Sequence, residues 1–123
     1  MNELADLLGL DPADPEQALA LDLVKADHDM LRDLVWLRRK AHMRQEDVGA
    51  KFGVTQPTVQ AFERVGNDPR LSSIRRYALA IGARITHKVE RDSRLERIML
   101  RARDLSEEHD VVEQLARAEL SRA

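Results

Sequence analysis

The chain is poor in the residues that stabilise small domains by covalent or aromatic means. It has no cysteine, and aromatic residues make up only 3%, with one Trp, one Tyr and two Phe. The absence of cysteine excludes disulfides, thiolate metal sites and cysteine nucleophiles, and it permits a reducing compartment. A core must therefore be built from Leu, Val, Ile, Ala and Met, within a total of 43% hydrophobic residues.

Long apolar runs and targeting signals are missing as well. No stretch of about 18 apolar residues occurs, which excludes a membrane-spanning helix from the sequence pattern. The first ten residues, MNELADLLGL, are acidic and lack the basic region of a signal peptide. We therefore expect a cytoplasmic protein with no membrane partner.

Catalytic patterns are also lacking. The four histidines are His28, His42, His87 and His109, and no two of them have a metal-ligand spacing such as His-x-x-x-His. None stands beside a serine or an acid in a recognisable catalytic frame, and no glycine-rich phosphate loop occurs. We predict no enzymatic activity, no metal site and no cofactor.

Charge is distributed unevenly along the chain, although the net charge is only −2. Residues 1–26 hold six acids and one Lys, residues 27–91 hold thirteen Lys or Arg and eight acids, and residues 92–123 hold six Arg and eight acids. The central part thus carries a net charge of +5 between two acidic parts. A basic region of this kind attracts a phosphate backbone, so the charge pattern favours a nucleic-acid partner.

The segment from Arg44 to Arg64, RQEDVGAKFGVTQPTVQAFER, predicts two short helices joined by a tight turn. The first helix is expected over about 45–52, and Gly53 ends it because glycine enters the left-handed region at little cost. Thr55 can cap the second helix with its hydroxyl, and Pro57 suits its first turn. The second helix is expected to continue to 62–63.

The two predicted helices have distinct inner and outer faces. One apolar set recurs at helical spacing and comprises Val48, Phe52, Val54, Val59 and Phe62. The outward residues at the start of the second helix are Thr55, Gln56, Pro57, Thr58 and Gln60. These side chains are small, neutral and mostly hydrogen-bonding, a composition expected of a helix that lies in the major groove of DNA.

This pattern resembles the lambda-repressor-like, Xre-type helix-turn-helix family over about residues 34–88. The matching positions are Gln45, Val48, Gly49, Gly53, Val54, Thr55, Gln56, Val59 and Glu63. Gly49 stands where the family usually has Ala, which allows close helix approach but lowers helix propensity by roughly 1 kcal/mol. Ala61 stands where many members carry a longer polar side chain, so one customary DNA contact is missing.

The motif and the resemblance together assign candidate site residues. The predicted base-reading residues are Gln56, Pro57, Thr58 and Gln60. Gln56 is the best candidate because its amide can bind adenine through two hydrogen bonds, the alternative being a solvated polar residue. The predicted phosphate contacts are Arg44, Gln45, Thr55, Arg64, Arg70 and Arg75, with Arg76 beside the last. The resemblance also implies a structural ion pair between Arg38 and Glu63.

The rest of the chain predicts further helices and one strand. Residues 15–42 can form one long helix or two that break near 27–29, and residues 2–9 form a short helix or arm. Residues 66–70 are a loop, and helices are expected over 72–81, 93–103 and from Ser106 onward. Residues 84–90 alternate, with Ile85, His87 and Val89 on one face, which predicts a strand.

A lone strand needs a partner for its backbone hydrogen bonds. We expect Ile85, His87 and Val89 to pair with the same strand of a second copy across a two-fold axis. The alternatives are an edge strand on the domain's own helices, an irregular segment, or pairing with a different protein.

The sequence therefore predicts a mainly α protein, a lambda-repressor-like helix-turn-helix bundle with one short β-strand and helical extensions at both ends. The expected domains are an acidic extension over 1–26, the DNA-binding domain over 27–83, and a dimerisation or partner-binding region over 84–123. The expected function is a homodimeric repressor of bacterial or phage origin that occludes a promoter at a palindromic operator. The alternatives are an antitoxin that binds a toxin and autoregulates its operon, and a phage immunity or Cro-like repressor.

Overall fold

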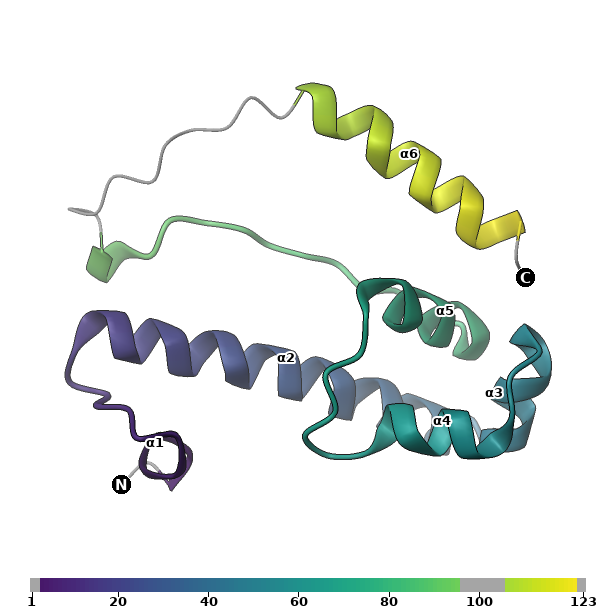
Figure 1. Cartoon of the computed structure of the whole chain (residues 1–123), viewed down its shortest axis with the longest axis horizontal. Helices are drawn as coiled ribbons and strands as arrows, with labels where there is room; N and C mark the ends of the chain where they lie inside the picture. The colour runs from purple at the N-terminus through teal and green to yellow at the C-terminus, as the bar shows by residue number, and fades with distance from the viewer. Residues whose placement is uncertain (1–2, 96–105, 122–123) are drawn as a thin grey trace. The chain divides into compact units, whose positions relative to one another are not determined.

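The computed structural model describes residues 3–95 and 106–121, and it is mainly helical (Figure 1). The elements are α1 (Glu3–Leu8), α2 (Pro15–Lys40), α3 (Gln45–Phe52), α4 (Gln56–Glu63), α5 (Leu71–Ile81), the 3-10 turn η1 (Ser93–Leu95) and α6 (Ser106–Ser121). None of the described helices combines the length and the apolar character that crossing a membrane requires. The chain divides into two compact units, Met1–Met30 with His87–Ala102 and Leu31–Thr86 with Arg103–Ala123.

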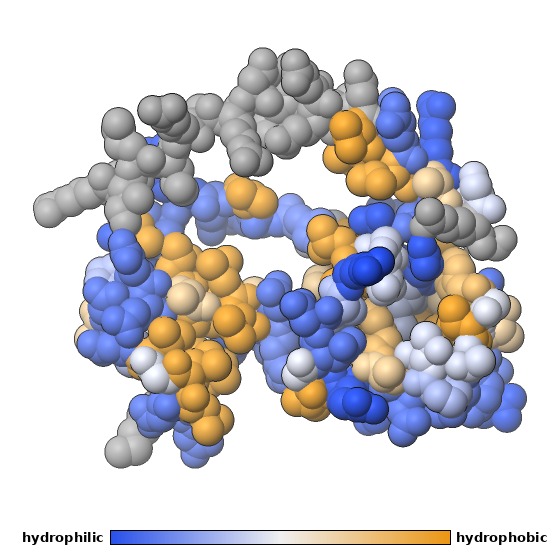
Figure 2. Space-filling model, viewed as in Figure 1, coloured by the Kyte–Doolittle hydropathy of each residue, from blue (hydrophilic) through white to orange (hydrophobic). Residues whose placement is uncertain are grey.

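The first unit is organised by the junction between α1 and α2. The Asp14 carboxylate accepts a hydrogen bond from the Gln17 backbone N–H at 3.1 Å, and Pro15 opens the helix, so α2 begins with a side-chain cap. Ala5, Ala18 and Leu21 are buried between the elements of this unit. Other apolar side chains of α1 and of the first half of α2 stay exposed, and Figure 2 shows them gathered over these two helices.

Helix α2 is continuous from Pro15 to Lys40, so the structure selects one long helix over two. No glycine or proline interrupts it after Pro15. Its last turn carries Arg38, Arg39 and Lys40, whose positive charges interact favourably with the negative end of the helix dipole. The helix ends at Lys40, and His42 in the turn that follows adopts a positive φ of 57°. Its carboxyl-terminal half supplies Leu34 and Arg38 to the core of the second unit.

The core of the second unit lies among α2, α3, α4 and α5. Its buried apolar residues are Leu34, Val48, Val59, Ile74, Tyr77, Ala78 and Ala80. The rings of Phe62 and Tyr77 stack with their centroids 4.5 Å apart, which joins α4 to α5. Gly53 and Gly82 end α3 and α5 in the left-handed conformation, with φ of 69° and 72°.

The predicted strand is wrong. The structure has no strand in the residues it describes, and residues 84–90 form neither helix nor strand. The expected alternation also fails, because Ile85 is half-buried whereas His87 and Val89 are both exposed, Val89 to 97%. The physical reason is pairing: a strand is maintained by a neighbouring strand, and the described part of the chain provides none. The predicted helix over 93–103 is a 3-10 turn at Ser93–Leu95, and its remainder lies outside the described residues.

Gly49 is the tightest point of the helix-turn-helix. A Cβ atom at this position would lie 2.6 Å from the carbonyl oxygen of Val54, a backbone atom of the turn that leads into α4. The Val54 backbone N–H donates to the Gly49 carbonyl at 3.0 Å, which holds the turn against α3. The missing side chain at position 49 therefore allows the approach of the two helices.

Alanine at position 49 should destabilise this unit although alanine is the better helix former. We expect Gly49→Ala to lower the free energy of unfolding by about 1–3 kcal/mol, because the added methyl group displaces backbone. This is the net loss that remains after the gain of about 1 kcal/mol in helix propensity has been subtracted. Urea unfolding followed by circular dichroism measures the difference, with Ala50→Gly as the control for propensity alone. A Gly49→Ala variant more stable than the parent would contradict the close approach.

Candidate nucleic-acid interface

The turn between α3 and α4 is built by short-range hydrogen bonds. The Asp47 carboxylate accepts from the Arg44 backbone N–H at 2.8 Å, which caps the start of α3. The Thr55 hydroxyl accepts from the Thr58 backbone N–H at 3.4 Å and shares a hydrogen bond with the Thr58 hydroxyl at 2.9 Å. Pro57 stands in the first turn of α4, where its missing N–H leaves no partner unsatisfied. The first turn of α4 is thus fixed by its own side chains.

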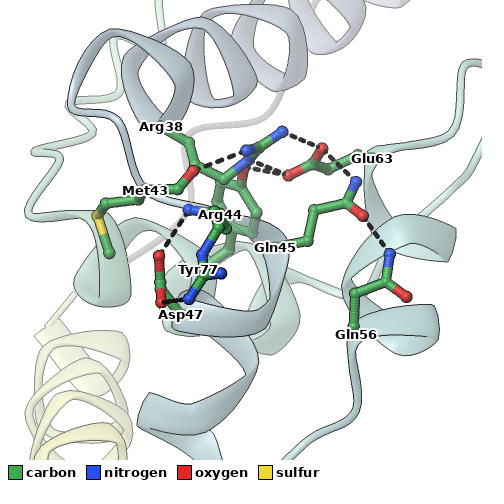
Figure 3. Close-up of polar contacts among 8 residues, drawn as sticks. All are labelled: Arg38, Met43, Arg44, Gln45, Asp47, Gln56, Glu63 and Tyr77. Atoms are coloured by element: carbon green, nitrogen blue, oxygen red, sulfur yellow. Dashed lines mark hydrogen bonds and ion pairs between the residues drawn. The ribbon is translucent and has the colours of Figure 1, made fainter.

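A buried carboxylate lies behind the exposed face of α4 (Figure 3). Glu63 accepts from Arg38 Nε at 2.6 Å and from Arg38 Nη2 at 2.8 Å, a two-point ion pair whose side chains are 8% and 6% exposed. The Tyr77 hydroxyl donates to the same carboxylate at 2.6 Å, and Gln45 Nε2 donates to it at 3.0 Å. Arg38 Nη1 also donates to the Met43 carbonyl at 2.8 Å. Side chains from α2, α3 and α5 therefore converge on the last residue of α4.

These contacts keep Glu63 ionised and Tyr77 protonated. Burial raises the pKa of Glu63, but the hydrogen bonds from Arg38, Tyr77 and Gln45 and the charge of Arg38 outweigh it and hold that pKa below its usual value. Burial and the hydrogen bond to Glu63 both raise the pKa of Tyr77. The cluster is therefore an anion surrounded by donors at neutral pH.

The cluster extends to the surface through two glutamines. Gln45 donates its amide N–H to Glu63, and its carbonyl oxygen accepts from Gln56 Nε2 at 2.5 Å. A carboxylate can only accept, so the nitrogen of Gln45 faces Glu63 and its oxygen faces Gln56. This order leaves Gln56 with its carbonyl oxygen and one N–H available. One acceptor beside one donor is the pattern that matches the major-groove edge of adenine.

The other predicted base-reading residues surround Gln56 on the same helix. Pro57, Thr58 and Gln60 are all exposed on α4, and Gln56 is half-buried. Their side chains therefore give α4 an exposed, uncharged surface.

The predicted phosphate contacts are placed differently from one another. Arg64 and Arg70 are exposed and flank α4 and α5 at the ends of the connecting loop. Arg44 is 75% exposed, but its guanidinium lies 3.4 Å from Asp47 and 3.7 Å from Glu46, so a phosphate must compete with both. Arg75 is half-buried, and its Nη2 donates to Glu119 of α6 at 3.0 Å.

Two functional contacts were missed from the sequence. The hydroxyl of Tyr77 joins the Glu63 cluster, and the sequence pattern had assigned this residue no role. A buried tyrosine hydroxyl normally has a hydrogen-bond partner, and this rule was the available signal. Glu119 also binds Arg75 and Arg76, and no local spacing indicated this contact between distant segments.

A cleft of about 280 Å³ lies between α3, α4 and α5. Phe52 and Phe62 line it together with Thr58, Asn67 and Arg76. Arg76 of α5 thus borders the same cleft as Thr58 of α4. Among the residues that the structure describes, no group of three His, Asp or Glu side chains is placed to hold a metal ion.

Comparison with known proteins agrees with this geometry. Residues 34–87 match the family described as Helix-turn-helix. This segment belongs to the helix-turn-helix family. The match contains every residue of the turn and of the Glu63 cluster, and α3 and α4 are the two helices on either side of that turn.

Two curated relatives carry the same segment. Antitoxin HigA1 of Mycobacterium tuberculosis, from strains CDC 1551 and H37Rv, is 37% identical over 73 residues, which cover 59% of this chain and 49% of the relative. The chain thus spans about half the length of the curated relatives it matches. No solved structure matches the chain.

The pH dependence of stability tests the Glu63 cluster. Because the native pKa of Glu63 is lowered, its contribution is present above the unfolded pKa of about 4.3 and is lost as pH falls through the native value. We expect Glu63→Gln to lower the free energy of unfolding by about 3 kcal/mol at pH 7, because it leaves Arg38 buried without a counter-charge. The difference in free energy of unfolding between the variant and the parent should become smaller as pH falls from about 5 to about 3.

Urea unfolding at several pH values measures both effects. Glu46→Gln is the matched control, because Glu46 is an exposed carboxylate on α3 and its replacement should change stability little at any pH. A Glu63→Gln difference that stays constant from neutral to acidic pH would show that ionised Glu63 does not stabilise the domain.

Proposed function

We propose that the chain is a sequence-specific, double-stranded DNA-binding regulator of transcription without enzymatic activity. The single observation that supports this most directly is the hydrogen-bond order Glu63–Gln45–Gln56. It leaves one donor and one acceptor of Gln56 available on a recognition helix whose neighbouring residues are exposed and neutral. Such an edge discriminates bases, whereas a helix used only for packing would bury it.

The proposed contacts divide into reading and positioning sets. Gln56 reads a base together with Pro57, Thr58 and Gln60. The proposed phosphate contacts from this face are Arg44, Gln45, Thr55, Arg64 and Arg70. The amino terminus of α3 adds the favourable end of its dipole beside Arg44 and Gln45. These positioning contacts carry no sequence information but set affinity and its dependence on salt.

Regulation is proposed to occur as a homodimer on a palindromic operator. Two recognition helices would enter successive major grooves about 34 Å apart on one face of the duplex. A dimer bound in this way occupies promoter DNA and represses by occlusion. The protein would act in the cytoplasm and associate with the nucleoid when bound.

The second candidate function is that of an antitoxin that also autoregulates its operon. The similarity to the two HigA1 antitoxins favours it. The acidic residues 1–26 and the exposed apolar side chains of α1 and α2 offer a surface for a basic protein partner. In this function the helix-turn-helix domain keeps its DNA-binding role, and the toxin is an additional partner. A phage immunity or Cro-like repressor differs only in its genetic setting.

Replacement of Gln56 tests base reading. After selection of an operator from genomic fragments, Gln56→Ala should weaken operator binding by roughly 1–3 kcal/mol and leave binding to random duplex nearly unchanged. Arg44→Ala is the comparison: it should weaken both and reduce the slope of log K against log salt by about one. Equal losses on operator and random DNA for Gln56→Ala would contradict base reading by this residue.

Co-expression tests the antitoxin function. If the chain is an antitoxin, expression with the product of an adjacent small gene should relieve growth arrest caused by that product, and the two proteins should co-elute. We expect the combined exchange of Leu7, Leu8, Leu23 and Val24 to serine to abolish co-elution while operator binding persists. Operator binding without relief or co-elution would instead identify a regulator that acts without a toxin.

A further inference from the structure

The carboxyl-terminal helix α6 is attached to the helix-turn-helix domain by a buried carboxylate. Glu119 accepts from Arg75 Nη2 at 3.0 Å and from Arg76 Nε at 3.3 Å. The side chain of Glu119 is 8% exposed, whereas those of Arg75 and Arg76 are 38% and 36% exposed. One carboxylate therefore engages two neighbouring arginines of α5 from a segment 43 and 44 residues away in the chain.

Little else in the described residues holds α6 in place. Its large apolar side chains remain exposed, with Val111 at 54%, Val112 at 61%, Leu115 at 46% and Leu120 at 68%. Burial of apolar surface is the main stabilising term in helix packing, so α6 lacks most of it. The ion pairs of Glu119 with Arg75 and Arg76 are the principal specific contacts of this helix. Such ion pairs are weakened by salt and by other anions.

Charge indicates what could replace Glu119. The residues of α6 include Glu107, Glu108, Asp110, Glu113 and Glu119 against Arg117 alone. This acidic helix lies on α5, in the central part of the sequence that carries a net charge of +5. The two arginines stand in the middle of α5, and Arg76 borders the same cleft as Thr58 of α4. A guanidinium pair in this position suits a phosphate group as well as a carboxylate.

We propose that Arg75 and Arg76 form a phosphate-binding site for duplex DNA that Glu119 occupies in the free protein. A DNA phosphate and the Glu119 carboxylate compete for the same two guanidinium groups. Helix α6 then reduces DNA affinity, and DNA binding releases α6 together with its exposed apolar face. This inference rests on the proposed DNA-binding function and adds to it an internal competitor with a defined residue.

Neutralisation of Glu119 tests the competition. Glu119→Gln in the full chain should raise affinity for operator and for random duplex on the order of tenfold at low salt, a typical coupling between two sites. Glu113→Gln is the matched control: it changes net charge equally on the same helix, but Glu113 is exposed, and both arginines pair with Glu119 instead.

A second substitution separates the site from a general charge effect. In the Glu119→Gln protein, Arg75→Gln combined with Arg76→Gln should remove the gain in DNA affinity. In the protein with Glu119 intact, the same two substitutions should weaken DNA binding much less, because Glu119 already occupies the two arginines. Reciprocity adds an independent measurement: amide hydrogen exchange in α6 of the parent protein should accelerate when duplex DNA is added. Equal gains for Glu119→Gln and Glu113→Gln, or unchanged exchange in α6 on DNA binding, would overturn the competition.

The outcomes also separate this inference from the function on which it rests. A parent protein that binds its operator while Glu119→Gln binds it no more tightly would contradict the competition and leave the DNA-binding function intact. Failure of both proteins to bind any duplex would overturn the DNA-binding function and, with it, this inference.

Discussion

The organisation of the helix-turn-helix domain depends on one acceptor-only group, the carboxylate of Glu63. It lies at the end of the recognition helix and receives hydrogen bonds from Arg38 of α2, Gln45 of α3 and Tyr77 of α5. A buried charge is tolerated only when it is paired and its lone pairs are satisfied, and here all the surrounding helices provide the donors. Removal of any one donor therefore affects the placement of α4 relative to its neighbours.

The same carboxylate determines a property of the surface. Because Glu63 cannot donate, it orients the amide of Gln45, and Gln45 in turn orients the amide of Gln56. The edge that Gln56 presents is thus set from the interior. Gly49 contributes in a different way, since its missing side chain lets the turn approach α3 closely enough for the two glutamines to meet. Core packing and proposed base recognition depend on the same few contacts.

Local rules predicted much of this arrangement from the sequence. The cap at Thr55, the stop at Gly53 and the apolar spacing from Val48 to Phe62 are short-range features, and the structure has both helices within a residue of their expected bounds. The strand at 84–90 was wrong because alternation alone does not supply a pairing partner. The contact of Glu119 with Arg75 and Arg76 joins segments far apart in the sequence, and neither segment carries a pattern that indicates the other. The hydrogen bond of Tyr77 was accessible in principle, since a buried hydroxyl requires a partner.

The central claim is that Glu63 organises the domain through a buried ion pair with Arg38. Hydrogen exchange of the arginine Nε–H groups, followed by ¹H–¹⁵N NMR, tests it most directly. The Nε–H of Arg38 donates to Glu63, whereas Arg39, its neighbour in sequence, is exposed. The account predicts a resolved Arg38 Nε–H signal that exchanges slowly with water and shows magnetisation transfer to the Tyr77 ring, beside a rapidly exchanging Arg39. Equally rapid exchange of the two arginines at neutral pH would contradict it.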